Sequence, residues 1–63
     1  MFEVIHEWED GTKFGLGEDG SYKLLYKGVL ENITVIRSGL FNMAVCDNKD
    51  VPRNLLAEIG QNL

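Results

Sequence analysis

The chain has 63 residues, with 10 acidic and 6 basic side chains and a formal net charge of −4. We expect one domain over residues 1–63, because a chain this short has a small core and little room for an enclosed active site. Its single cysteine excludes an internal disulfide, and no apolar run is long enough to predict a membrane span or a signal peptide. We therefore expect a cytoplasmic protein without a cofactor, stabilised by binding another protein or a second copy of itself.

Residues 1–27 predict a meander of three antiparallel strands joined by two copies of one turn, at residues 9–11 and 18–20, each with the sequence Glu-Asp-Gly. A two-residue Asp-Gly turn would mix apolar and charged residues on both faces of the sheet. A three-residue loop with its glycine in the left-handed conformation places the apolar residues on one face. The predicted pairs are Trp8 with Thr12, His6 with Phe14, Val4 with Leu16, Gly17 with Ser21, Leu16 with Tyr22, Phe14 with Leu24, and Thr12 with Tyr26.

Alternation along these strands then separates an inner, core-facing side of the meander from an outer one. The predicted inner side holds Phe2, Val4, His6, Trp8, Thr12, Phe14, Leu16, Tyr22, Leu24 and Tyr26. On the outer side, Ile5 and Leu25 flank Gly15, whose missing side chain leaves the backbone open to close approach. The predicted partner-binding residues are this apolar notch and its charged rim: Ile5, Glu7, Lys13, Gly15, Lys23 and Leu25.

Residues 32–46 predict a pair of strands. Val29 to Asn32 is compatible with a helical turn or an extended segment, and we interpret it as a short connection. A third three-residue loop, Arg37-Ser38-Gly39, would pair Val35 with Phe41 and Ile33 with Met43. Both faces of this pair are apolar, so we expect it to fold across the meander or to be covered.

Residues 51–60 predict a short helix. Asp50 is a suitable N-cap, Pro52 fits the first turn, and Gly60 would mark the end. Its apolar residues form one narrow stripe, and a helix of about ten residues needs such packing to be stable. The predicted fold is mainly β (α+β): a five-stranded antiparallel meander, or a small barrel resembling the SH3-like barrels, with a short C-terminal helix. The stripe consists of Leu55, Leu56 and Ile59.

No motif in the chain predicts catalysis, a cofactor or a metal. Residues 15–20 spell G-x-G-x-x-G, but a strand follows where a dinucleotide site needs a helix. His6 and Glu7 point to opposite faces of their strand, so they cannot share a metal ion, and Glu3 and Glu7 lie on an open face that cannot separate their pKa values. Cys46 beside an acidic residue is expected to be unreactive.

Three hypotheses for function follow. The first is a non-enzymatic protein-binding module, a regulator or inhibitor of a larger partner. The second is a nucleic-acid-binding small barrel that uses Lys23, Lys27 and Arg37. The third is an acidic mimic of nucleic acid that blocks a DNA- or RNA-binding protein. Its acidic groups would be Glu7, Glu9, Asp10, Glu18 and Asp19.

Overall fold

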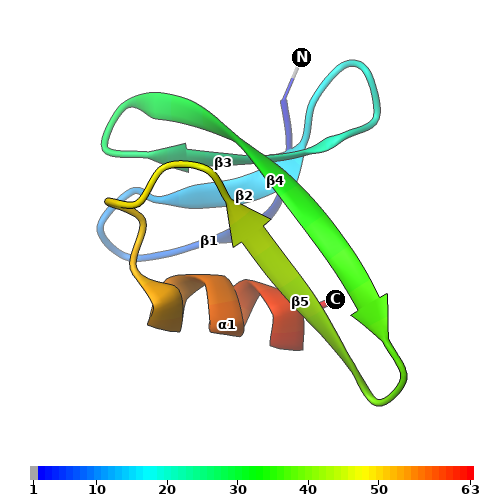
Figure 1. The fold of residues 1–63 in the computed structure, drawn as a ribbon. Coiled ribbons are helices and arrows are strands. Elements are labelled where there is room, and N and C mark those ends of the chain that lie inside the picture. Colours follow the sequence, from blue (N-terminus) through cyan, green and yellow to red (C-terminus); the bar gives the residue numbers. More distant parts are fainter. Residues whose placement is uncertain (1) are drawn as a thin grey trace.

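The computed structural model describes residues 2–63. Its elements are β1 (Glu3–Glu7), β2 (Lys13–Leu16), β3 (Tyr22–Tyr26), β4 (Val29–Ser38), β5 (Phe41–Cys46) and α1 (Arg53–Gln61). The strands are antiparallel and lie in the sheet in chain order, β1-β2-β3-β4-β5 (Figure 1). The sheet is open, with β1 and β5 at its edges, so the predicted meander describes the chain better than the predicted barrel.

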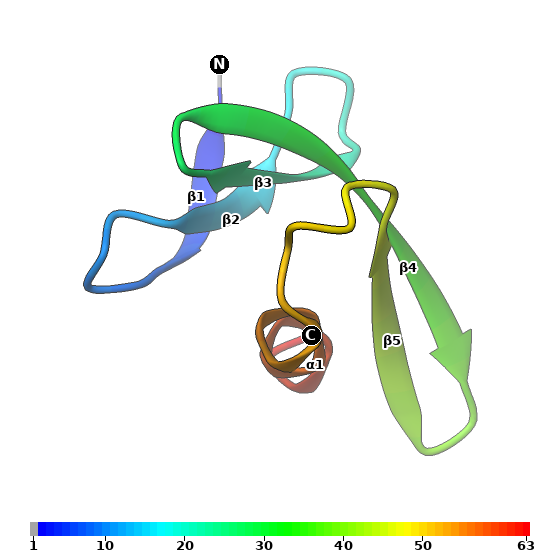
Figure 2. The ribbon, with the colours of Figure 1, turned by 60° about the vertical axis from the view of Figure 1, so that its left-hand side comes forward.

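The long strand β4 divides the sheet into two halves. Its beginning pairs with β3, from Val29 opposite Tyr26 to Asn32 opposite Lys23. From Ile33 onward the strand pairs with β5 instead. The β4–β5 hairpin consequently diverges from the meander, and α1 lies between the two halves (Figure 2).

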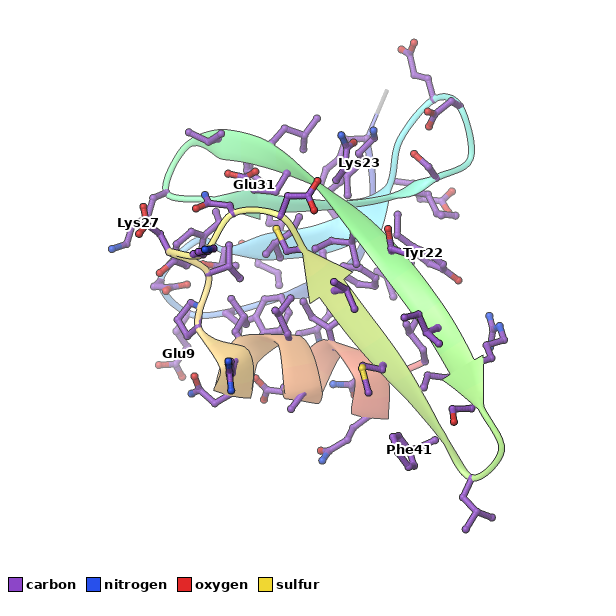
Figure 3. All side chains as sticks on the ribbon, viewed as in Figure 1. Glu9, Tyr22, Lys23, Lys27, Glu31 and Phe41 are labelled. Carbon is purple, nitrogen blue, oxygen red and sulfur yellow. The ribbon has the colours of Figure 1, made fainter. Side chains whose placement is uncertain are left out.

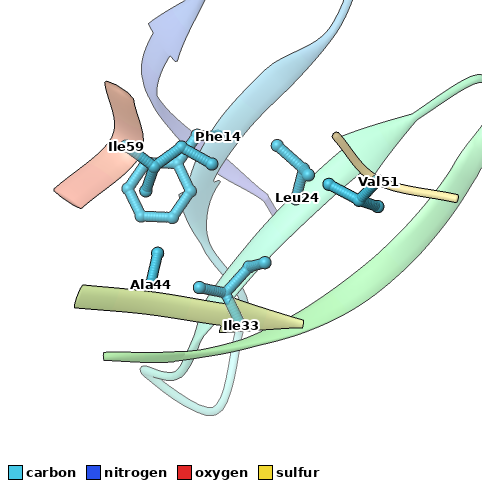
Figure 4. Packing of buried hydrophobic residues seen from close by; sticks show 6 residues of the cluster. All are labelled: Phe14, Leu24, Ile33, Ala44, Val51 and Ile59. Carbon is cyan, nitrogen blue, oxygen red and sulfur yellow. The ribbon is translucent and has the colours of Figure 1, made fainter. Parts of the chain in front are cut away.

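The core lies where the meander, the hairpin and α1 meet (Figure 4). Phe14 and Leu24 come from the predicted inner side of the meander, and Ile59 comes from the predicted stripe of α1; these are the largest fully buried side chains among the described residues. Trp8 is only half-buried, and its indole Nε1 donates a 2.7 Å hydrogen bond to Glu58 Oε2 of α1. The buried hydrophobic residues are Phe14, Leu24, Ile33, Ala44, Val51 and Ile59.

The two Glu-Asp-Gly loops have the predicted geometry. In the first, the Trp8 N–H donates to the Thr12 carbonyl at 2.8 Å. In the second, the Gly17 N–H donates to the Ser21 carbonyl, also at 2.8 Å. Each loop ends on a glycine with positive φ, 92° at Gly11 and 81° at Gly20, a conformation that glycine adopts without steric cost.

The predicted pairing of Val4 with Leu16 is wrong, because a β-bulge interrupts β1 between Val4 and His6. Val4 pairs with Gly15, so it leaves the inner side and is 45% exposed. Gly15 explains the irregularity, since a Cβ there would overlap the Glu3 carbonyl oxygen. The absent side chain lets the backbone of β1 approach closely.

The interpretation of residues 29–32 as a connection is also wrong. Lys27 and Gly28 form a two-residue turn with φ of 49° and 80°, as in a type I′ turn, and β4 begins directly at Val29. The strand β4 therefore starts three residues before the predicted Asn32, and its first four residues pair with β3.

The predicted register of the β4–β5 hairpin is wrong because its turn is Gly39-Leu40 and not Arg37-Ser38-Gly39. Ser38 pairs with Phe41 and Val35 with Ala44. The observed partner of each β4 residue lies three positions further along than predicted, and an odd shift turns every β5 side chain to the other face of the sheet. Ala44 is therefore buried, and the side chains that were expected to pack beside Val35 and Ile33 are exposed.

The helix begins later than predicted, at Arg53, and Asp50 is not its N-cap. Pro52 occupies that position in extended conformation, with φ −63° and ψ 143°, and its carbonyl accepts the first helical hydrogen bonds. Asn48 organises the preceding loop: its side chain accepts from the Asp50 N–H at 2.9 Å and donates to Glu31 of β4 at 2.6 Å.

The helix ends at Gln61, one residue after the predicted end at Gly60. Gly60 lies inside α1 and is buried. A Cβ at this position would overlap the Asn42 carbonyl oxygen of β5. The glycine thus serves close packing of the helix on the edge strand.

Candidate partner-binding faces

The outer side of β1 to β4 forms a surface that we call the meander face. Two cross-strand rows run over it. Alternation along antiparallel strands places all residues of these rows on one side of the sheet. One row consists of Glu7, Lys13, Leu25 and Leu30, and the other of Val4, Gly15, Lys23 and Asn32.

The structure brings most of the predicted partner-binding residues together on this face. Glu7, Lys13 and Leu25 are direct neighbours in one row, and Gly15 and Lys23 are partners in the other. Ile5 is the bulge residue and has no cross-strand partner in the ladder, although it is 46% exposed. Gly15 is buried beneath the Glu3 backbone, so this protein's own chain occupies the close approach that we expected of a partner.

Lys23 is held in place on the meander face. Its Nζ donates a hydrogen bond to Asn32 Oδ1, directly opposite on β4. Its aliphatic stem packs over Gly17, where an added Cβ would lie 3.0 Å from Lys23 Cε. Figure 3 shows Lys23 beside the loop between β2 and β3. A shallow hollow at this position is lined by Phe2, Gly17, Glu18, Asp19, Lys23 and Leu30.

Sequence reasoning missed three apolar residues of this surface: Phe2, Val4 and Leu30. The bulge moves Val4 beside Gly15, in the place predicted for Ile5. Leu30 lies opposite Leu25 and is 53% exposed. A glycine inside a strand pattern is a signal for a bulge, and a Lys-Gly pair before a β-branched residue is compatible with a tight turn, so both corrections had a signal in the sequence.

The outer side of the β4–β5 hairpin forms a second surface, which we call the hairpin face: Thr34, Ile36, Ser38, Phe41, Met43 and Val45. None of these residues is charged. Phe41 is 62% exposed, and Leu40 at the adjoining turn is fully exposed. Phe41 projects near the tip of the hairpin, away from Lys23 (Figure 3).

A groove runs beside the hairpin face where β5 meets α1. Phe41, Met43 and Val45 line it on the strand side. On the helix side the lining includes Leu56 and Ala57, and Arg53 is the charged residue among those that line the groove. The groove therefore adjoins the hairpin face and shares Phe41, Met43 and Val45 with it.

The carboxylates of the two loops are engaged in their own turns. The backbone N–H of Thr12 donates to Asp10 Oδ1 at 3.0 Å. The Ser21 hydroxyl and N–H donate to Asp19 Oδ1 at 2.7 and 3.0 Å. These hydrogen bonds favour the ionised forms and lower the pKa of both carboxyls below the ordinary value of 3.8, with a small contribution from Lys23 at Asp19.

The basic residues predicted for nucleic-acid binding are spread over the molecule. Lys23 lies near the start of β3, and Lys27 lies in the turn after it, with Nζ 5.4 Å from the Tyr26 ring centroid. Arg37 lies near the far end of β4, beside the hairpin tip. These three side chains do not form one stripe.

The described residues offer little for other chemistry. Over residues 2–63, no three His, Cys, Asp or Glu side chains gather as metal ligands. The helix in that range, α1, is too short to cross a bilayer. Cys46 is half-buried at the end of β5 and packs against the core. Comparison with protein-family models, curated proteins and solved structures finds no significant match.

Proposed function

We propose that this chain is a small, non-enzymatic protein-binding module that acts as a regulator or inhibitor of a larger partner in the cytoplasm, and that the meander face binds this partner. The observation that carries the proposal is the cross-strand pair of Leu25 and Leu30. Leu30 is 53% exposed although it lies in the middle of the sheet, where β3 and β4 are paired.

Charged residues of both signs surround this apolar pair. Lys13 is the neighbour of Leu25 on β2, Glu7 follows on β1, and Lys23 lies in the adjacent row. An apolar centre with a polar, mixed-charge rim is the composition of interfaces between proteins that also exist separately. Rim charges select the partner by electrostatic complementarity and increase the association rate.

The hydrogen bond from Lys23 to Asn32 supports the same reading. A long side chain that is already ordered loses less conformational entropy on binding than a free one. The hollow between Phe2, Leu30 and the loop of residues 17–19 gives this surface a shallow recess for a partner side chain. The meander face thus combines the charge of Lys23 with a recess between two apolar side chains.

Two aspartate substitutions at neighbouring positions of β4 test the proposal. Leu30→Asp places a charge in the centre of the meander face, whereas Val29→Asp changes a residue of similar exposure, 56%, that alternation directs to the other side. The immobilised chain is used to retrieve binding proteins from its native cell. We expect Leu30→Asp to lose the retrieved protein and Val29→Asp to keep it, with both variants melting close to the parent chain.

Retention of the same partner by both variants would show that binding does not involve the meander face. Retrieval of no protein by the parent chain, at any salt concentration, would contradict the proposed function itself.

A further inference from the structure

We infer that the hairpin face is a self-association surface, on which a second copy of this chain docks with the same face in a two-fold arrangement. The hairpin face differs from the rest of the chain in charge. A quarter of the residues of the chain are charged, 25%, and its net charge is −4, yet none of the six residues of the hairpin face is charged. Two acidic copies repel each other over most of their surfaces, and this face is where they meet without opposed charges.

The composition of the face fits an interface between identical chains. Homodimer interfaces are more apolar than those of separable partners, are depleted in charged residues and are enriched in aromatic residues and Met. Phe41 and Met43 lie on β5, and Ile36 lies opposite Met43 on β4. The meander face, with its charged rim of Glu7 and Lys13, has instead the composition of an interface between separable partners.

The extent of the surface fits a weak dimer. Exposure ranges from 38% at Val45 to 101% at Leu40, which gives an apolar patch of about 500 Å², near the upper limit for the largest patch of a monomer. The adjoining groove along α1 shares Leu40, Phe41, Met43 and Val45 with this patch and adds little area to it. Two such patches bury about 1,000 Å² in total, which is the lower limit for a specific interface and is typical of weak association. The exposed residues of the patch are Ile36, Leu40, Phe41, Met43 and Val45.

The fold also determines how the copies meet. Addition of a strand at the free edge of β5 would need access to its backbone, but α1 covers that edge where Gly60 packs on the Asn42 carbonyl. Association through the face of the hairpin leaves this contact intact. A face-to-face contact with the same patch on both sides is isologous, and it closes as a dimer without extending into a fibre.

The test measures mass by light scattering or sedimentation over a concentration series from about 1 μM to about 1 mM, a range that covers weak and strong dimers. For the parent chain we expect twice the monomer mass of 7.1 kDa at high concentration. Phe41→Asp and, on the other strand, Ile36→Asp are expected to remain monomeric. Thermal melting of each variant shows whether it is folded, and we expect both to fold because Ile36 is 47% and Phe41 62% exposed.

Leu30→Asp is the matched control, because it introduces the same charge at an exposed apolar residue of the same strand outside the hairpin face. We expect it to dimerise like the parent chain. A parent chain that keeps a mass of 7.1 kDa over the whole series overturns the inference, as does a dimer that dissociates with Leu30→Asp and not with Phe41→Asp. The first result leaves the proposal for the meander face unaffected, because that proposal is tested by retrieval of a different protein. The second result would place the second copy on the meander face instead.

Discussion

The two outer faces of this sheet differ in charge although they share the strand β4. Leu30 and Asn32 at the beginning of β4 belong to the meander face, and Thr34 and Ile36 further along belong to the hairpin face. The meander face surrounds its apolar centre with charged side chains, whereas the hairpin face has none. A single strand therefore contributes to surfaces of two kinds, and the surface changes at the residue where β4 changes its partner strand.

The largest expected effect is the difference in stability between a variant of the shared core and a variant of an outer face. Phe14→Ala removes a fully buried ring at the junction of the meander, the hairpin and α1 and is expected to cost about 3 to 5 kcal/mol, enough to unfold a domain of this size. Met43→Ala on the hairpin face is expected to change the free energy of unfolding by less than about 0.5 kcal/mol at concentrations where the chain is monomeric. Urea unfolding of both variants measures the difference. Equal losses would show that the hairpin face is part of the core.

The next largest effect is expected where an added Cβ would disrupt a close backbone contact, at Gly15 in the meander and at Gly60 beside the hairpin. Gly15→Ala would push β1 away from β2 at the Glu3 carbonyl, and Gly60→Ala would push α1 away from β5 at the Asn42 carbonyl. Each is expected to cost about 1 to 3 kcal/mol, as overpacking does, although alanine gains up to about 1 kcal/mol of helix propensity at Gly60. Hydrogen exchange should localise the damage to the edge of the affected half. Gly11→Ala is a useful contrast, because it strains φ and has no atom nearby to clash with.

A smaller effect concerns the contact between the first loop and α1. Glu58→Ala removes the acceptor of the 2.7 Å hydrogen bond from Trp8 Nε1 and is expected to cost about 0.5 to 1.5 kcal/mol. In a domain of this size 1 kcal/mol corresponds to a fall of about 4 to 8 °C in melting temperature. Glu58→Gln keeps an acceptor and should recover most of the loss. Equal melting of the Ala and Gln variants would show that the bond contributes no stability.

The smallest effect is the pH dependence that arises from the two loops of the meander. Because folding lowers the pKa of Asp10 and Asp19 below 3.8, the stabilisation that they supply is fully present above that value and is lost as the pH falls through the lower folded-state values. The double variant Asp10→Asn, Asp19→Asn keeps an acceptor for the turn and does not titrate. We expect its melting temperature to fall less than that of the parent chain between about pH 5 and about pH 2. Parallel curves would assign acid sensitivity to other carboxylates.

The sequence predicted the meander well because two independent signals agree there. The repeated Glu-Asp-Gly loops set the register. The alternation of apolar with charged residues shows which side of each strand faces the core. The bulge in β1 was missed because Gly15 was interpreted as an opening for a partner and not as the place where the chain's own Glu3 carbonyl would pack. The predicted site consequently contained Ile5 in place of Val4.

The hairpin could not be placed in register from its sequence in the same way. Ile33 to Cys46 is apolar on both faces, so alternation does not distinguish the inner side from the outer. The choice of turn then depended on Gly39, which fits the last position of a three-residue loop as well as the first position of a two-residue one. Only packing against α1 decides between them, since Ala44 fits beside the helix at Gly60. The sequence therefore predicted apolar residues on both faces of the hairpin, but not that Phe41 and Met43 lie on the outer one.

The chain-order topology of the sheet also has a kinetic consequence. Every strand pairs with the next one in sequence, across loops of two or three residues, so each ladder can form without first closing a long loop. Docking of α1 is different, because the contact between Trp8 and Glu58 joins positions 50 residues apart and has a larger loop-closure entropy. Since rates of folding increase as contacts become more local, we expect fast formation of the hairpins and a transition state limited by the arrival of the helix.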